Sequence, residues 1–255
     1  MNRNTPEEKF TAAARSGHAS ELKCLLADGV CVDYKDVYGT TALHYASCGG
    51  HTECIKILIA AGAEIDIRDP NGETSLHYAA YRAQMDAVSL LIAAGADLEA
   101  RHINGGTPMH RAATGGYSGC VCLLKDAGGN INATDTNLNT PLHKAVILGQ
   151  RQCVAVLLKL GADPDMPDSS GCTPLFYAAR YGSDDIMKRL INAGANPFAQ
   201  RMGLRSPIDE FAVKQPEKYK KDSFGIRILA EKAMAKRLKK EDKSRTAATG
   251  YEFDI

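Results

Sequence analysis

The chain has 255 residues, of which 31 are Lys or Arg, 30 are Asp or Glu and 44% are hydrophobic. This near-average composition argues against wholesale disorder, and a net charge of +1 gives the whole chain no nucleic-acid-binding signature. No apolar run is long enough to cross a bilayer, and the N-terminus lacks the apolar stretch of a secretory signal. We therefore expect no membrane association and a cytoplasmic location, with an additional nuclear location as a further option.

The first predicted element begins at Thr5, where Thr5-Pro-Glu-Glu8 forms a capping box with proline in the first helical position. An N-terminal capping unit over residues 5–38 is predicted to contain two helices. From there a period of 33 residues governs the chain: glycine recurs at 29, 62, 95, 128, 161 and 194. Threonine recurs at 41, 74, 107, 140 and 173. Such a period predicts a stack of repeats over 39–71, 72–104, 105–137, 138–170 and 171–203.

One period shows why each unit should contain two helices. Thr74 is placed to cap a first helix, and a second helix is predicted over residues 85–94. Gly95 then supplies the left-handed backbone that ends a helix. The predicted inward positions are Leu76, Ala79, Ala80, Val88, Leu91 and Ile92. One unit is too thin to bury these residues alone, so the units must stack.

The motif Thr41-Ala-Leu-His-Tyr-Ala46 and its counterparts at 74, 107, 140 and 173 resemble the T-P-L-H-x-A signature of the ankyrin-repeat family. The resemblance covers about residues 5 to 212. It implies an all-α solenoid of helix-turn-helix-hairpin units, in which His44, His77, His110 and His143 hold loops by backbone hydrogen bonds. Two departures stand out: Phe176 replaces the histidine, and Leu138 replaces a turn glycine, so that loop is expected to differ locally.

After the repeats we predict a C-terminal capping repeat with an irregular segment over 204–225, a basic amphipathic helix over 226–243 and a flexible tail over 244–255. Within the helix, Lys236–Lys240 is either an import signal, a contact for an acidic partner, or a solvated polar face. Phe253 and Ile255 fit the ending that PDZ-type domains bind, although a plain disordered terminus is the alternative.

The sequence lacks the common catalytic motifs. It contains no phosphate-binding loop, nucleophile elbow or zinc-protease motif. The eight cysteines include no Cys-x-x-Cys pair, and we expect all of them to be reduced. Cys54, Cys120 and Cys153 share one repeat position and are interpreted as small core residues. Asn132 resembles, weakly, an asparagine that is hydroxylated in ankyrin proteins, or it is an ordinary turn residue. We expect no enzyme, cofactor or metal.

These observations predict a protein–protein interaction adaptor or regulatory subunit, monomeric by itself, that binds a partner protein. The alternative is a nuclear transcriptional cofactor that inhibits a transcription factor. In ankyrin proteins the turn tips and first helices line the concave side, where Tyr and Arg often dominate binding energies. The candidate partner-binding residues are Tyr38, Tyr45, Tyr78, Tyr81, Arg82, Arg111, Tyr177, Arg180 and Tyr181. For Tyr45, Tyr78 and Tyr177, filling a gap between helices is the alternative.

Overall fold

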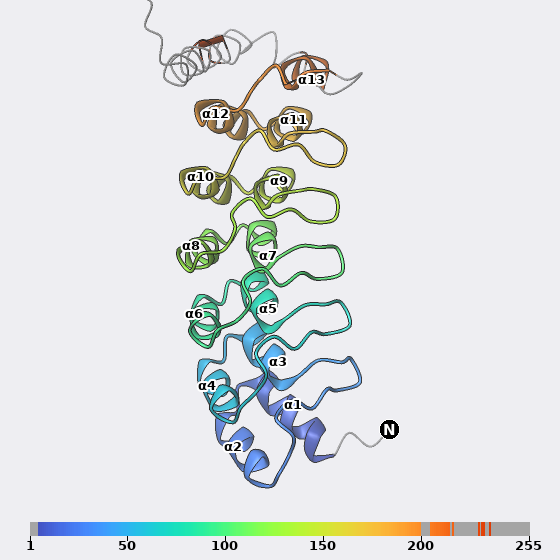
Figure 1. The fold of residues 1–255 in the computed structure, drawn as a ribbon, viewed down its shortest axis with the longest axis vertical. Helices are drawn as coiled ribbons and strands as arrows, with labels where there is room; N and C mark the ends of the chain where they lie inside the picture. Colours follow the sequence, from blue (N-terminus) through green and yellow to red (C-terminus); the bar gives the residue numbers. More distant parts are fainter. Residues whose placement is uncertain are drawn as a thin grey trace, which may run out of the picture. The chain divides into compact units, whose positions relative to one another are not determined.

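The fold is seen in a computed structural model, which describes residues 5–199 and 205–214 and the single positions 216, 229, 231, 232 and 235. Among these residues there are thirteen α-helices and no strand, which confirms the predicted all-α class (Figure 1). The chain divides into two compact units, residues 1–162 and residues 163–255.

In the first unit the helices come in five pairs, each joined by a short turn. The first members are α1 (Pro6–Ser16), α3 (Ala42–Gly49), α5 (Ser75–Tyr81), α7 (Pro108–Gly115) and α9 (Pro141–Ile147). The second members are α2 (Ala19–Ala27), α4 (Thr52–Ala60), α6 (Met85–Ala93), α8 (Ser118–Asp126) and α10 (Arg151–Lys159). First helices pack on first helices and second on second, so that two layers form, with loops projecting beyond the first layer (Figure 1).

Each first helix starts where the sequence predicts. Thr5 accepts the Glu8 amide proton at 3.2 Å, and the Glu8 carboxylate accepts in return from the Thr5 amide. Thr74 sits in extended backbone before α5, and its amide donates to His77 Nδ1 at 3.2 Å. Histidine thus takes the place of glutamate in the capping box, which satisfies two backbone amides at the helix start, those of Thr74 and His77.

The core of the first unit is the apolar stripe between its two layers. The predicted inward residues Leu76, Ala79, Ala80, Val88 and Leu91 are all buried, whereas Ile92 is half-buried. Cys54, Cys120 and Cys153 are buried in equivalent places on α4, α8 and α10, as expected for small core residues. Within this unit each repeat therefore buries its stripe against the next, as a stacked architecture requires.

The turn that contains Leu138 does not differ from its neighbours, so the expectation of a local difference was wrong. Leu138 has φ 57°, close to the φ of 73° and 74° that Gly72 and Gly105 adopt at the equivalent positions. The loop keeps the conformation of its neighbours, because leucine is forced into the left-handed region. That region costs a residue with a Cβ about 1–2 kcal/mol.

Replacing Leu138 with glycine should raise the free energy of unfolding by about 0.5–1 kcal/mol, because the relieved strain exceeds glycine's entropic cost. Leu138 is 48% exposed, so little burial is lost. Urea unfolding checks the value, and Ala83→Gly, at φ 58°, should behave alike. Leu148→Gly is the matched control, since Leu148 is similarly exposed but has φ −91°. An equal gain in that control would contradict the strain argument.

The second unit contains α11 (Pro174–Arg180), α12 (Asp184–Asn192) and α13 (Pro207–Lys214), and α13 packs on α11. Phe176 and Phe211 are buried, so Phe176 fills its slot as an apolar residue where other repeats have histidine. Most of residues 217–255 lie outside the described residues. The basic helix over 226–243, Lys236–Lys240, the tail over 244–255 and the Phe253–Ile255 ending stay predictions for that reason.

No disulfide joins the eight cysteines, all of which the structure describes. Cys24 and Cys31 are exposed, while burial raises the pKa of Cys120 to about 11 and that of Cys153 to about 12. A thiolate is the reactive form. A colorimetric thiol reagent should therefore modify Cys24 and Cys31 rapidly in the native protein, and Cys120 and Cys153 only on unfolding. Fewer than eight thiols after denaturation, or equal native rates at all eight, would refute this prediction.

Candidate functional site

In three of the four hairpin turns of the first unit, one aspartate organises the loop beyond the first-helix layer. In the hairpin turns at residues 36–40, 69–73 and 135–139, the first residue is aspartate, and its Oδ1 accepts from two later amides of the turn. For Asp69 the donors are the amides of Asn71 and Glu73, at 2.9 and 2.8 Å. Asp36 and Asp135 make the same pair of contacts. These carboxylates fix the turn backbone, because each satisfies two amide donors.

The second oxygen of each aspartate ties the turn to the helix that follows. Tyr45 donates its hydroxyl to Asp36 Oδ2 at 2.6 Å, and Tyr78 donates to Asp69 Oδ2 at 2.9 Å. Burial and the aspartate together raise the pKa of both phenols. In the second unit Tyr177 donates to Asp168 in the same way, at 2.6 Å. The three tyrosines thus have a structural role within the chain, and partner contact through their exposed edges stays a prediction.

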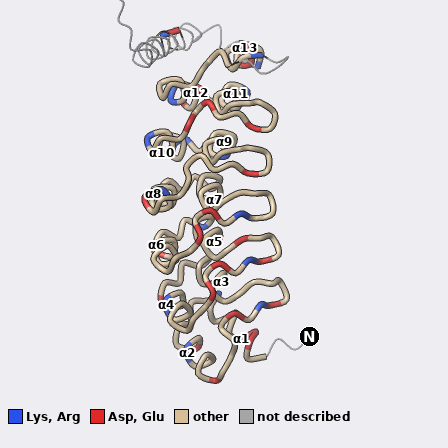
Figure 2. The backbone as a smooth tube through the Cα atoms, in the orientation of Figure 1, with Lys and Arg blue, Asp and Glu red and all other residues tan. Residues whose placement is uncertain are grey.

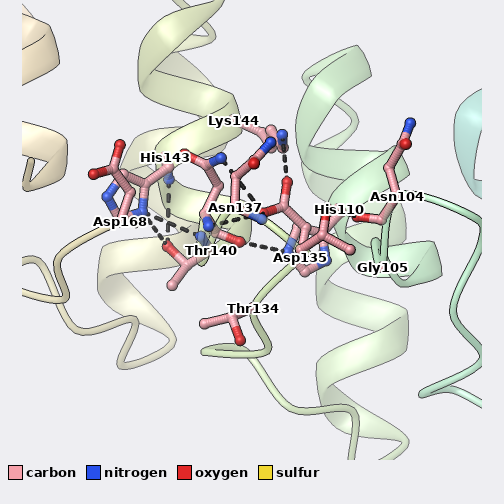
Figure 3. Close-up of polar contacts among 12 residues, drawn as sticks. Asn104, Gly105, His110, Thr134, Asp135, Asn137, Thr140, His143, Lys144 and Asp168 are labelled. Atoms are coloured by element: carbon pink, nitrogen blue, oxygen red, sulfur yellow. Dashed lines mark hydrogen bonds and ion pairs between the residues drawn. The ribbon is translucent and has the colours of Figure 1, made fainter. Parts of the chain in front are cut away.

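Two consecutive repeats lack this hydrogen bond between a turn aspartate and a tyrosine of the following helix. Lys144 replaces the tyrosine on α9, and its ammonium lies 2.6 Å from Asp135 Oδ2 (Figure 3). Although burial alone would raise the pKa of Asp135, Lys144 and the turn amides lower it. In the turn at 102–106 the first residue is His102 instead of aspartate, and its Nδ1 accepts from the Asn104 amide at 3.0 Å.

Arg111, nine residues after His102, therefore has no carboxylate in its own turn. It reaches back to the preceding turn, where its Nε lies 2.5 Å from Glu73 Oε1. Burial raises the pKa of Glu73, and Arg111 opposes that rise. The guanidinium also lies over the ring of Tyr81, 5.5 Å from its centroid. Tyr81, Arg111 and Glu73 form one connected group, which sequence spacing does not reveal.

We define the inner face of the first unit as its hairpin turns together with the exposed side of its first helices. Tyr38 at a turn tip is 69% exposed and Tyr81 at the end of α5 is 47% exposed. Arg82 is exposed beside Tyr81, and Figure 2 shows acidic and basic residues on the loops next to α3, α5 and α7. Large amphipathic side chains and charges of both signs thus lie together on this face.

The second unit has a smaller set of predicted residues. Tyr181 is 56% exposed, and its ring stacks on Tyr177 with the centroids 6.3 Å apart. Arg180 is exposed as well. Five of the nine predicted residues are exposed, namely Tyr38, Tyr81, Arg82, Arg180 and Tyr181, and the other four are half-buried.

Three of the T-P-L-H histidines, His44, His77 and His110, act as the family resemblance implies. Nδ1 of His77 accepts from Thr74, and its Nε2 donates to the carbonyl oxygen of Gly106 in the next turn, at 3.2 Å. His110 makes the corresponding bond to Asn139 O at 2.9 Å. Burial lowers the pKa of His77 to about 3 and that of His110 to about 4. These neutral imidazoles staple neighbouring turns together, and they are not metal ligands here.

Within the part of the chain that the structure describes, no group of three or more His, Cys, Asp or Glu side chains is placed to hold a metal. None of the described helices is long and apolar enough to cross a membrane. Sequence reasoning missed the turn aspartates, although Asp36, Asp69, Asp135 and Asp168 keep the period of 33. This periodic spacing of the aspartates would have been enough to predict them from the sequence.

Comparison with known proteins agrees with this geometry. A sequence profile described as "Ankyrin repeats (3 copies)" matches residues 4–69, 61–135 and 119–201. The crystal structure of the human ASB11 ankyrin repeat domain is similar, with a TM-score of 0.73 and 30% sequence identity, over 81% of this chain and 94% of that one. A search of curated proteins found no match. With most of its length matched by repeats whose turns and histidine staples the structure shows, the chain belongs to the ankyrin-repeat family.

Proposed function

We propose that the protein is an adaptor or regulatory subunit that binds a partner protein through its inner face, which corresponds to the concave side of ankyrin stacks. Ankyrin repeats are protein–protein interaction modules, which gives the general class of function. The observation that carries the finer proposal is the exposed pair Tyr81 and Arg82, next to the Tyr81–Arg111–Glu73 group.

This pair has the chemistry of a binding hot spot. Tyr and Arg combine a large contact area with hydrogen bonding, and they are enriched among residues that dominate interface energies. The Tyr81 ring is held in place by Arg111, so that less side-chain entropy is lost on binding. Arg111 is itself fixed by Glu73, so the face is preorganised.

The double variant Tyr81→Ala and Arg82→Ala should weaken partner binding by more than about 2 kcal/mol and change the free energy of unfolding by less than about 1 kcal/mol. The partner is first captured from native lysate with the tagged full chain and identified by mass spectrometry. Affinities of the purified pair are then measured by calorimetry.

The matched control is Asp86→Ala with Ser89→Ala, two exposed changes on α6 of the opposite layer, which should leave the affinity unchanged. Full-strength binding by a folded Tyr81→Ala, Arg82→Ala variant would refute the inner face as the site. An equal loss in the α6 control would refute it too.

A further inference from the structure

The inner face of the first unit is hollowed at one place by a cavity of about 330 Å³. Its walls come from α7, α9 and the turns beside them, and they include His102, Gly106, Arg111, Asp135, Lys144 and Leu148. This volume lies within the range of ligand pockets that take a small molecule or a side chain.

The cavity is found where the tyrosine pattern is interrupted. At the equivalent positions Tyr45 and Tyr78 place a phenol ring between turn and helix, held by the turn aspartate. Arg111 and Lys144 occupy these positions in the next two repeats, and each side chain forms an ion pair with a carboxylate. Two tyrosine rings are therefore missing in consecutive repeats, and the His102 imidazole occupies the space directly beside Gly106.

The charges of the cavity are already balanced. Arg111 is paired with Glu73. Lys144 is paired with Asp135 (Figure 3). An isolated anion would have to compete with carboxylates that are in place, so a phosphate or a free carboxylate is a poor occupant. The remaining walls are Ile147, Leu148 and the imidazole of His102, next to the alkyl stems of the two cations.

An aromatic ring suits such walls. Cations attract the face of an aromatic ring even when their charge is paired, and this surface already uses that contact twice. Arg15 lies 4.0 Å from the centroid of the Tyr45 ring, and Arg111 lies over Tyr81. The cavity therefore offers an incoming ring the surroundings that the chain's own tyrosines have elsewhere on the same face.

We propose that this cavity binds an aromatic side chain of the partner protein, in the place where repeats 105–137 and 138–170 lack their own tyrosine. This inference rests on the proposed function and specifies its recognition chemistry. The ring enters between α7 and α9, packs on Leu148 and lies against the cationic groups of Arg111 and Lys144.

The test titrates the ¹⁵N-labelled full chain with p-cresol, the side-chain analogue of tyrosine, and follows backbone amide shifts. We expect saturable shifts at Gly106, Thr114 and Leu148. The non-aromatic analogue 4-methylcyclohexanol should bind at least about threefold more weakly, since it lacks the ring face. Absence of shifts, equal binding of both alcohols, or shifts with inorganic phosphate alone would each overturn the proposal.

Lys144→Tyr is the decisive variant, because it recreates the tyrosine–aspartate pair that Tyr78 and Asp69 form. It should fold with a melting temperature at or above the wild-type value and lose p-cresol binding. Lys56→Tyr, an exposed change on α4, is the matched control and should retain the binding. Leu148→Ala, at a half-exposed position, should weaken it without unfolding the chain. Unchanged binding in both Lys144→Tyr and Leu148→Ala would overturn the site.

Failure of this inference can be told apart from failure of the proposed function. The p-cresol titration needs no partner, so it reports on the cavity alone. A partner that binds Lys144→Tyr with wild-type affinity but not the Tyr81→Ala, Arg82→Ala variant would leave the inner face as the interface and refute the aromatic pocket.

Discussion

Replacing Leu91 with alanine is expected to lower the free energy of unfolding by about 2–5 kcal/mol. Leu91 lies on α6 with no exposed surface, in the layer between α4 and α8. Its removal leaves a cavity that the short helices around it cannot close, because they are held on both sides. Leu124, the equivalent residue on α8, is buried in the same way and should show a similar loss.

Urea unfolding followed by circular dichroism measures the loss. Because each repeat contacts only its neighbours, weakening a central interface should also broaden the transition. Leu148→Ala is the matched control, since Leu148 is 52% exposed, and it should cost less than about 1 kcal/mol. A loss below about 1 kcal/mol for Leu91→Ala, or an equal loss in the control, would contradict the stacked core.

The second large effect is acid sensitivity. His77 and His110 have pKa values of about 3 and about 4 in the folded chain, whereas an unfolded histidine has about 6.5. Between these values the unfolded state binds more protons, so protonation favours unfolding as the pH falls below about 6.5. Each histidine then lowers the free energy of unfolding by about 1.4 kcal/mol per pH unit, which amounts to about 2 kcal/mol at pH 5. Above pH 7 neither contributes to the pH dependence.

Urea midpoints at pH 7.5, 6 and 5 check this slope. His110→Phe copies the residue that Phe176 supplies at the equivalent place, and it removes one titrating group. Its stability at pH 7.5 should be lower, because a hydrogen bond to the next turn is lost, but its decline between pH 6 and 5 should be shallower by about 1.2 kcal/mol. A slope equal to that of the wild type would show that His110 is not the group that titrates.

Much of the fold was predictable because the same local signals recur in every repeat. The threonine caps, the Leu76 and Leu91 stripes and the histidine staples all follow from local rules applied with a period of 33. The conformation of the turn at Leu138 was harder to predict, since leucine rarely adopts a left-handed backbone. There the neighbouring turns impose the conformation, which is a tertiary effect.

The site was less predictable than the fold. Tyr78 and Asp69 are nine residues apart, and only the folded-back turn brings them together. Arg111 and Glu73 are separated by a whole repeat, and they meet because His102 stands where an aspartate would otherwise hold the position. Exposure of Tyr81 and Arg82 beyond the alanine pair of the helix was predictable from the period, but the cavity was not.

Site-specific photocrosslinking is the most direct test of partner binding through the inner face. The photoreactive residue p-benzoylphenylalanine is introduced at Tyr81 on the inner face or at Ser89 on the exposed side of α6. Irradiation with the captured partner should produce a covalent complex from position 81 and none from position 89. A crosslink from position 89 alone, or equal yields from the two, would contradict binding through the inner face.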